Sequence, residues 1–172
     1  MSNFSRLIRA VPDFPKPGIL FRDITPALED PHAFREMIDL FAERYAGKGV
    51  TKVAGIESRG FILASALAYA LSAGLVILRK PGKLPRQTVS ASYALEYGES
   101  TLHLHTDALH PNDTVVVLDD LVATGGTLAA AVKLVQSTRA TLLETAAIIE
   151  LGALGGRKAL PAGVGLHTLL TY

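Results

Sequence analysis

Continuous apolar runs alternate with amphipathic segments along most of the chain. The apolar runs predict buried strands, and apolar residues at helical spacing predict helices between them. The predicted strands are 53–56, 75–78, 115–118, 145–151 and 165–170. The predicted helices are 32–45, 61–71 and 128–136. Strands without polar alternation are typical of a parallel sheet covered on both faces, so the pattern predicts an α/β fold with a mainly parallel, five-stranded sheet flanked by helices.

Two segments depart from this alternation. Residues 1–35 are dense in proline, which removes backbone donors and restricts its neighbours, so we expect mostly irregular structure after a short helix near Ser5–Val11. Residues 80–111 contain two alternating stretches, near Ser90–Tyr97 and Thr101–His105, that predict a two-stranded ribbon. Long excursions within compact domains are often functional lids, so we interpret 80–111 as a lid.

Composition narrows the function classes. With 172 residues, 49% of them hydrophobic and 19% charged, the chain is expected to form one ordered domain, 1–172. A formal net charge of +1 gives no support for a nucleic-acid or membrane-surface partner. The chain has no cysteine, which excludes disulfides and thiolate metal sites. A polar N-terminus and the lack of a long apolar helix favour a cytoplasmic protein.

The stretch Val115–Thr127 carries the clearest chemistry, because an apolar strand runs into Asp119 and Asp120 and then into a loop of small residues. Ligands of parallel α/β sheets bind beyond the carboxyl ends of the strands. The loop residues, whose backbone N–H groups can approach an anion at a helix N-terminus, are Ala123, Thr124, Gly125, Gly126 and Thr127. The carboxylates would repel a phosphate but accept hydrogen bonds from hydroxyls, so a ribose 5-phosphate satisfies both parts.

The same residues have a plainer interpretation, because an aspartate pair or a glycine pair alone usually forms or caps a turn. The combination of strand, acidic pair and T-G-G-T is more specific than either part. It is not a Walker A loop, since no lysine follows the glycines.

The stretch resembles the phosphoribosyl pyrophosphate (PRPP) binding motif of type I phosphoribosyltransferases. The resemblance extends to Phe14–Pro26, Gly55–Phe61, Arg79–Pro85 and Ser92–Gly98, which are similar to members of this family that use adenine. It implies the type I phosphoribosyltransferase fold over 1–172, with a base-binding hood in 1–35 and a flexible β-ribbon lid in 80–111. It also implies transfer of the phosphoribosyl group of PRPP to adenine, which gives AMP and pyrophosphate. Mg²⁺ is the implied cofactor and a homodimer the implied assembly.

The resemblance further implies roles for individual residues. The pyrophosphate residues are Glu57, Ser58, Arg59, Arg79, Lys80 and Lys83, with a cis peptide at Glu57–Ser58. The adenine residues are Leu20, Phe21, Arg22 and Leu154. In the lid, Glu96 is expected to handle a proton near the adenine ring nitrogens, and Tyr97 is expected to order the loop. Outside the lid, Arg59 is expected to assist catalysis from the pyrophosphate side. PRPP and water would hold Mg²⁺, with Asp119 or Asp120 as the candidate protein ligands.

Other interpretations stay open. A PRPP-sensing regulator that binds nucleic acid would need a basic face or an added module, for which the chain has no spare length. A phosphoribosyltransferase for hypoxanthine, guanine or orotate fits the acidic pair, but the Phe14–Asp23 segment argues against it. Arg59 could instead form an ion pair, Glu96 could be a solvated loop residue, and Phe21 could simply pack in the core. His103 and His105 share one strand face without a third ligand, so we expect a solvated face rather than a zinc site.

Overall fold

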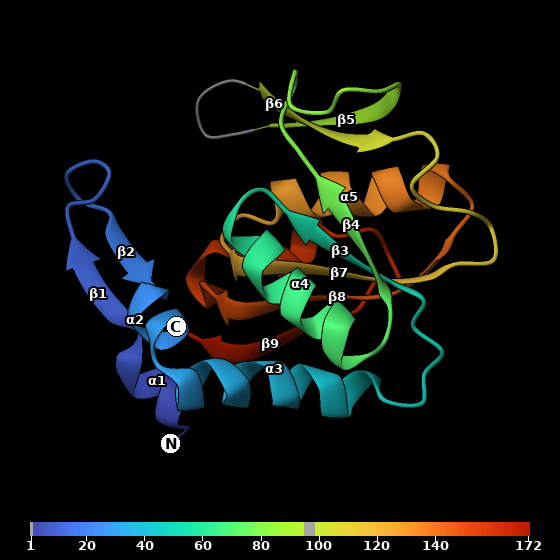
Figure 1. Cartoon of the computed structure of the whole chain (residues 1–172). Coiled ribbons are helices and arrows are strands. Elements are labelled where there is room, and N and C mark those ends of the chain that lie inside the picture. Colours follow the sequence, from blue (N-terminus) through green and yellow to red (C-terminus); the bar gives the residue numbers. More distant parts are fainter. Residues whose placement is uncertain (1, 95–98) are drawn as a thin grey trace. The chain divides into compact units, whose positions relative to one another are not determined.

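The structure is a computed structural model that describes residues 2–94 and 99–172 (Figure 1). The chain forms two compact units, Met1–Arg44 and Tyr45–Tyr172. That these units together make one phosphoribosyltransferase domain, 1–172, stays a prediction. Among the described residues, none of the helices combines the length and apolar character needed to cross a membrane.

The larger unit is built on a five-stranded sheet in the order β4–β3–β7–β8–β9. Its strands are β3 (Lys52–Ile56), β4 (Gly74–Leu78), β7 (Thr114–Val122), β8 (Thr141–Glu150) and β9 (Leu166–Thr171). All neighbouring strands are parallel, so the predicted α/β fold is confirmed. The predicted bounds of β7 were too short, because pairing with β8 carries the strand through its two aspartates to Val122.

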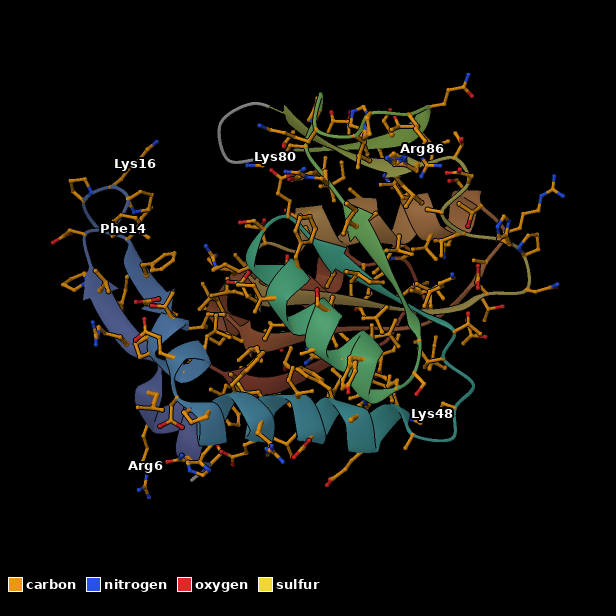
Figure 2. All side chains as sticks on the ribbon, in the orientation of Figure 1. Arg6, Phe14, Lys16, Lys48, Lys80 and Arg86 are labelled. Atoms are coloured by element: carbon orange, nitrogen blue, oxygen red, sulfur yellow. The ribbon has the colours of Figure 1, made fainter. Side chains whose placement is uncertain are left out.

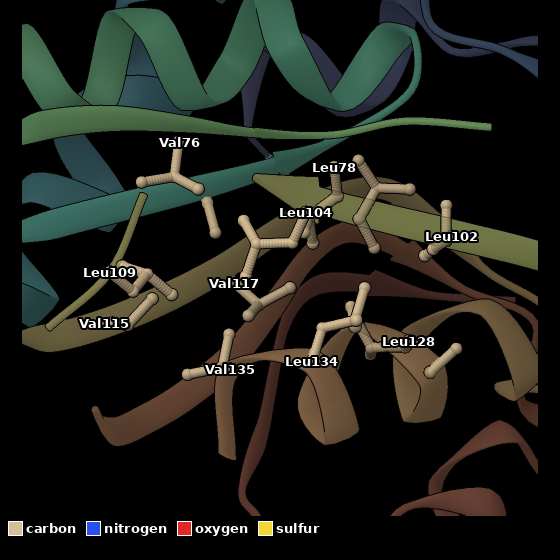
Figure 3. Close-up of a cluster of buried hydrophobic side chains, with 14 of the residues drawn as sticks. Val76, Leu78, Leu102, Leu104, Leu109, Val115, Val117, Leu128, Leu134 and Val135 are labelled. Carbon is tan, nitrogen blue, oxygen red and sulfur yellow. The ribbon is translucent and has the colours of Figure 1, made fainter. Parts of the chain in front are cut away.

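Helices α4 (Arg59–Ala70) and α5 (Gly126–Ser137) cover opposite faces of the sheet (Figure 1). On one face, strand side chains such as Val76 and Val117 pack with Leu134 of α5 in the main hydrophobic cluster (Figure 3). On the other face, Gly55 of β3 meets Ala64 of α4 so closely that a Cβ at residue 55 would lie 2.7 Å from the Ala64 Cβ. Apolar burial on both faces explains why the strands lack polar alternation.

Strands β5 (Thr88–Ala94) and β6 (Glu99–His105) pair antiparallel, which confirms the predicted ribbon. Leu102 and Leu104 are buried in the hydrophobic cluster, so this ribbon is packed on the core (Figure 3). The expected solvated face of β6 is wrong at His105, which is only 8% exposed. The chain turns just after it, with the Ala108 N–H donating to the His105 carbonyl. Among the described residues, no three histidine, aspartate or glutamate side chains are grouped to hold a metal.

The smaller unit contains α1 (Asn3–Leu7), β1 (Arg9–Pro12), β2 (Leu20–Asp23), α2 (Thr25–Glu29) and most of α3 (Pro31–Tyr45). The helix expected near Ser5–Val11 ends at Leu7, because the next residues pair with β2 in an antiparallel hairpin. Phe14 and Lys16 lie at the tip of this hairpin (Figure 2).

The expectation of mostly irregular structure in 1–35 was wrong, because the prolines stand where they remove no needed donor. Pro12 ends a strand, Pro31 opens α3, and Pro26 lies in the first turn of α2. The Asp30 carboxylate accepts hydrogen bonds from the backbone N–H groups of His32 and Ala33 at 3.0 and 2.8 Å, which fixes the start of α3.

Candidate functional site

Asp119 and Asp120 lie inside β7, where the strand is paired on one side only. β7 pairs with β8 through Val122 but with β3 only through Leu118, because β3 ends and the chain turns into α4. Our expectation placed both aspartates just past the strand end, and the structure corrects this. The carboxylates are therefore held on regular sheet backbone beside an opening at the carboxyl end of β3.

An ion pair joins the acidic pair to the start of α4. The Arg59 Nε donates to an Asp120 carboxylate oxygen, and Asp120 is only 6% exposed. The Asp119 Oδ1 accepts the Asp120 backbone N–H at 2.9 Å. Burial, and then the charge of Asp120, raise the pKa of the Asp119 carboxyl well above its ordinary value. Arg59 thus neutralises one carboxylate of the pair, while the other holds its negative charge less readily.

The predicted anion loop follows the acidic pair. Gly125 adopts φ 82° and caps α5, so Gly126 and Thr127 belong to the first helical turn rather than to the loop before it. The first N–H groups of a helix have no partner within the helix and carry positive potential. A pocket of about 100 Å³ lies here. Its lining consists of Asp119, Leu121, Val122, Ala123, Thr124, Gly125, Gly126, Thr127 and Leu128.

A second pocket, of about 230 Å³, adjoins the first. Its lining consists of Glu57, Ser58, Arg59, Lys80, Tyr93, Asp119, Asp120, Leu121 and Thr127. Both linings include Asp119 and Thr127. The anion pocket therefore continues into the second pocket, which carries both acidic and basic side chains. The Glu57–Ser58 peptide is cis, as the resemblance predicts. Sequence reasoning missed Tyr93, although it stands in the quoted Ser92–Gly98 motif.

The three basic residues that were predicted after β4, Arg79, Lys80 and Lys83, do not all face a pocket. Lys80, just past the end of β4, lines the second pocket, whereas Arg79 and the exposed Lys83 are absent from both linings (Figure 2). The Glu57 carboxylate accepts the Lys80 backbone N–H at 2.9 Å and the Arg79 Nε at 3.2 Å. Burial alone would raise the pKa of Glu57, but these two donors outweigh it, so the pKa lies below its ordinary value. Arg79 thus orients the turn at Glu57 instead of facing the pocket.

The residues expected to contact adenine lie in both units. Leu20, Phe21 and Arg22 stand on β2 of the smaller unit, where the Phe21 ring meets the Phe14 ring edge-on at 5.1 Å. Leu154 lies in a 3₁₀ helix, η1 (Gly152–Leu154), of the larger unit. Glu96 and Tyr97 lie outside the described residues. The adenine and lid assignments stay predictions.

Comparison with known proteins agrees with this geometry. The Phosphoribosyl transferase domain family matches residues 26–162. An adenine phosphoribosyltransferase of Anaeromyxobacter dehalogenans is 58% identical over 96% of this chain and 95% of its own length. The structure of the Rhodothermus marinus adenine phosphoribosyltransferase is 50% identical, with a TM-score of 0.94 over 98% of this chain and 96% of that one.

A more distant structure shows what such a fold accommodates. The Saccharomyces cerevisiae adenine phosphoribosyltransferase, 37% identical with a TM-score of 0.91 over 96% of each chain, is complexed with an imino-altritol bisphosphate and adenine. Sequence and structure therefore place this chain in the family of adenine phosphoribosyltransferases.

Proposed function

We propose that this protein transfers the phosphoribosyl group of PRPP to N9 of adenine and releases AMP and pyrophosphate, a purine-salvage reaction. One observation carries the proposal: the anion pocket at the start of α5 opens onto the acidic pair and its neighbouring cations. PRPP has the matching order of groups, a 5′-phosphate, ribose hydroxyls and a pyrophosphate. The family of the chain supplies adenine as the acceptor.

Different residues bind the different groups of PRPP. Residues 123–127 hold the 5′-phosphate through backbone N–H groups and hydroxyls, and Asp119 and Asp120 accept hydrogen bonds from the ribose hydroxyls. Arg59 and Lys80, which line the second pocket, face the pyrophosphate. The family resemblance also assigns Arg79 and Lys83 to the pyrophosphate, and these would reach it after the lid closes or two copies assemble. Adenine N9 forms the new bond to C1 as the C1–oxygen bond to pyrophosphate breaks, with the electron pair leaving on pyrophosphate.

Two further groups of residues complete the proposal. Leu20, Phe21, Arg22 and Leu154 contact the base, as the family resemblance implies. Glu96 accepts the adenine proton and Tyr97 orders the lid, which excludes water from the cation-like sugar at C1.

The carboxylate oxygens of the site fit a Mg²⁺ ion that is held mainly by the substrate. Mg²⁺ prefers oxygen ligands and keeps several waters, and Asp119 and Asp120, the candidate protein ligands, line the second pocket. When bound, Mg²⁺ neutralises charge on the leaving pyrophosphate. The chain itself orients the ribose and phosphate ends around that group.

Incubation with PRPP and Mg²⁺ plus adenine, hypoxanthine, guanine or orotate tests the reaction, with nucleotide formation followed by chromatography. We expect AMP from adenine. Turnover of another base without adenine would overturn the assignment of the base. PRPP binding without turnover of any base would favour a PRPP-sensing regulator.

We also propose that the protein is a cytoplasmic homodimer. Ile62 and Tyr69 are exposed on the outer side of α4, and Leu75 and Ile77 are exposed on the edge strand β4. Leu75 and Ile77 alternate with the buried Val76, so they project from the sheet face that α4 covers. Such an apolar surface is typical of an interface between copies. The cysteine-free composition fits a reducing compartment.

A further inference from the structure

Two glycines bring the C-terminal segment into direct contact with the anion loop. A Cβ at Gly125 would lie 2.1 Å from the carbonyl oxygen of Gly156. A Cβ at Gly156 would lie 2.5 Å from the Ala123 carbonyl oxygen and 2.7 Å from the Val122 Cγ1. The two backbones therefore touch without room for a side chain on either. Gly156 does not line the anion pocket, so it supports the loop from outside it.

An ion pair between the half-exposed Arg157 and the buried Glu150 fixes the segment that carries Gly156. This residue opens the 3₁₀ helix η2 (Gly156–Ala159), in which the Arg157 Nε donates to both Glu150 carboxylate oxygens at 2.9 Å. The other Arg157 nitrogens donate to Glu150 at 2.7 Å, to the Leu166 carbonyl at 2.6 Å and to Thr168 at 3.2 Å. Glu150 ends β8 and is only 5% exposed, whereas Leu166 begins β9. Arg157 thus ties η2 to two strands of the sheet.

We propose that Gly156, held by the Arg157–Glu150 pair, is a positioning residue that sets the anion loop for the 5′-phosphate of PRPP. The role rests on the proposed function and assigns part of PRPP affinity to a segment that does not line the anion pocket. Backbone N–H groups bind a phosphate only when they converge on it, so a small displacement of Ala123 or Gly125 weakens binding. Arg59 and Lys80 line the second pocket, whose lining does not include loop residues 123–126.

Gly156→Ala is the direct test, with ribose 5-phosphate and Mg²⁺–pyrophosphate as separate probes in calorimetry. We expect the affinity for ribose 5-phosphate to fall roughly ten-fold or more, while that for pyrophosphate stays unchanged. Gly152→Ala is the control in the same segment, because its Cβ would meet only the Thr171 side chain at 3.1 Å and the Tyr172 carbonyl at 3.5 Å. Equal losses for both probes, or no loss for either, would overturn the role.

Arg157→Lys and Arg157→Ala keep the test decisive if Gly156→Ala does not fold. Lysine retains the charge but not the forked donor geometry, so we expect the KM for PRPP to rise less in the lysine variant than in the alanine variant. In both, kcat at saturating PRPP stays close to the parent value. Arg86→Ala, which removes an exposed ion pair with Asp107, is the control. A fall in kcat or in melting temperature without a change in KM would refute positioning. A parent protein that makes no AMP would instead refute the proposed function.

Discussion

At the residue scale, the site depends on how each charge is held. Asp120 is buried against Arg59, and Asp119 next to it has a raised pKa. A hydroxyl-rich ligand that donates to both carboxylates stabilises their charged forms in a region where water is scarce. The acidic pair could be singled out from the sequence because an apolar run leads into it and the T-G-G-T loop follows it. The Arg59–Asp120 contact was not, because sequence spacing does not show which cation faces which carboxylate.

Asp120→Asn is expected to weaken PRPP binding, because the ribose hydroxyls lose an anionic acceptor. Hydrogen bonds to charged groups contribute about 1.5–3 kcal/mol, so the dissociation constant should rise roughly ten-fold or more. Calorimetry with PRPP and Mg²⁺ measures it. Asp107→Asn, which alters an exposed aspartate on another ion pair, should leave affinity unchanged. An unchanged affinity in Asp120→Asn would count against the ribose assignment.

Asp113 gives a prediction about stability and pH. Its carboxylate accepts hydrogen bonds from the His110 backbone N–H and the Thr51 hydroxyl, both at 2.8 Å. Burial would raise the pKa of Asp113, but these donors outweigh it, so the pKa lies below the ordinary value. The stabilisation is therefore complete above about pH 4 and is lost as pH falls through the lowered pKa.

Asp113→Asn should weaken the fall in stability below about pH 4. It should also lower the free energy of unfolding at neutral pH by about 1–3 kcal/mol. Urea unfolding at a series of pH values measures both effects. Asp39→Asn, at an exposed position of α3, is the matched control. If the unfolding free energy of the variant falls with decreasing pH as steeply as that of the parent, Asp113 does not contribute to the pH dependence.

At the element scale, strand β3 and helix α4 set the position of Arg59. Close packing of Gly55 on Ala64 brings the start of α4 to the acidic pair, and a Cβ at Gly60 would lie 3.0 Å from Asp119 Oδ1. Periodicity predicted the strand and the helix, because both bury one apolar face. It did not predict the hairpin β1–β2, since four-residue strands among prolines have no distinctive period. It also missed the extension of β7, because aspartates are unusual strand residues.

Gly55→Ala is expected to push α4 away from β3. The added Cβ would meet the Ala64 Cβ at 2.7 Å and the Gly60 carbonyl oxygen at 3.0 Å, neither of which can rotate away. Overpacking of this kind costs about 1–3 kcal/mol, and the KM for PRPP should rise as Arg59 shifts. Denaturant unfolding and steady-state kinetics measure the two effects. In the control Gly74→Ala, the new Cβ meets only the flexible Lys52 side chain at 3.0 Å, so a similar loss there would undermine the argument.

At the scale of the whole molecule, the five-stranded sheet and both flanking helices of the larger unit were predictable, and so was the family. The route from pattern to fold works here because the strands are buried on both faces. The adenine contacts and the proton-handling Glu96 were assigned by resemblance alone, since neither periodicity nor charge pattern distinguishes them from ordinary surface residues.

The apolar surface of α4 and β4 gives a prediction about assembly. Tyr69 is 89% exposed, and Tyr69→Glu would place a charge in the proposed interface between copies. We expect the variant to shift from dimer to monomer in sedimentation velocity. Lys133→Glu, on the exposed side of α5 across the sheet, should leave the assembly unchanged. A parent protein that is monomeric at high concentration would refute the interface.

The one-sided pairing of β7 has a consequence for the thermodynamics of recognition. Asp119 and Asp120 are ordered by the β8 ladder when the chain folds, before any ligand arrives. Their conformational entropy is lost once, during folding, and not again at each binding event. A ligand that docks on this strand therefore meets groups that are already immobile, which lowers the entropic cost of association.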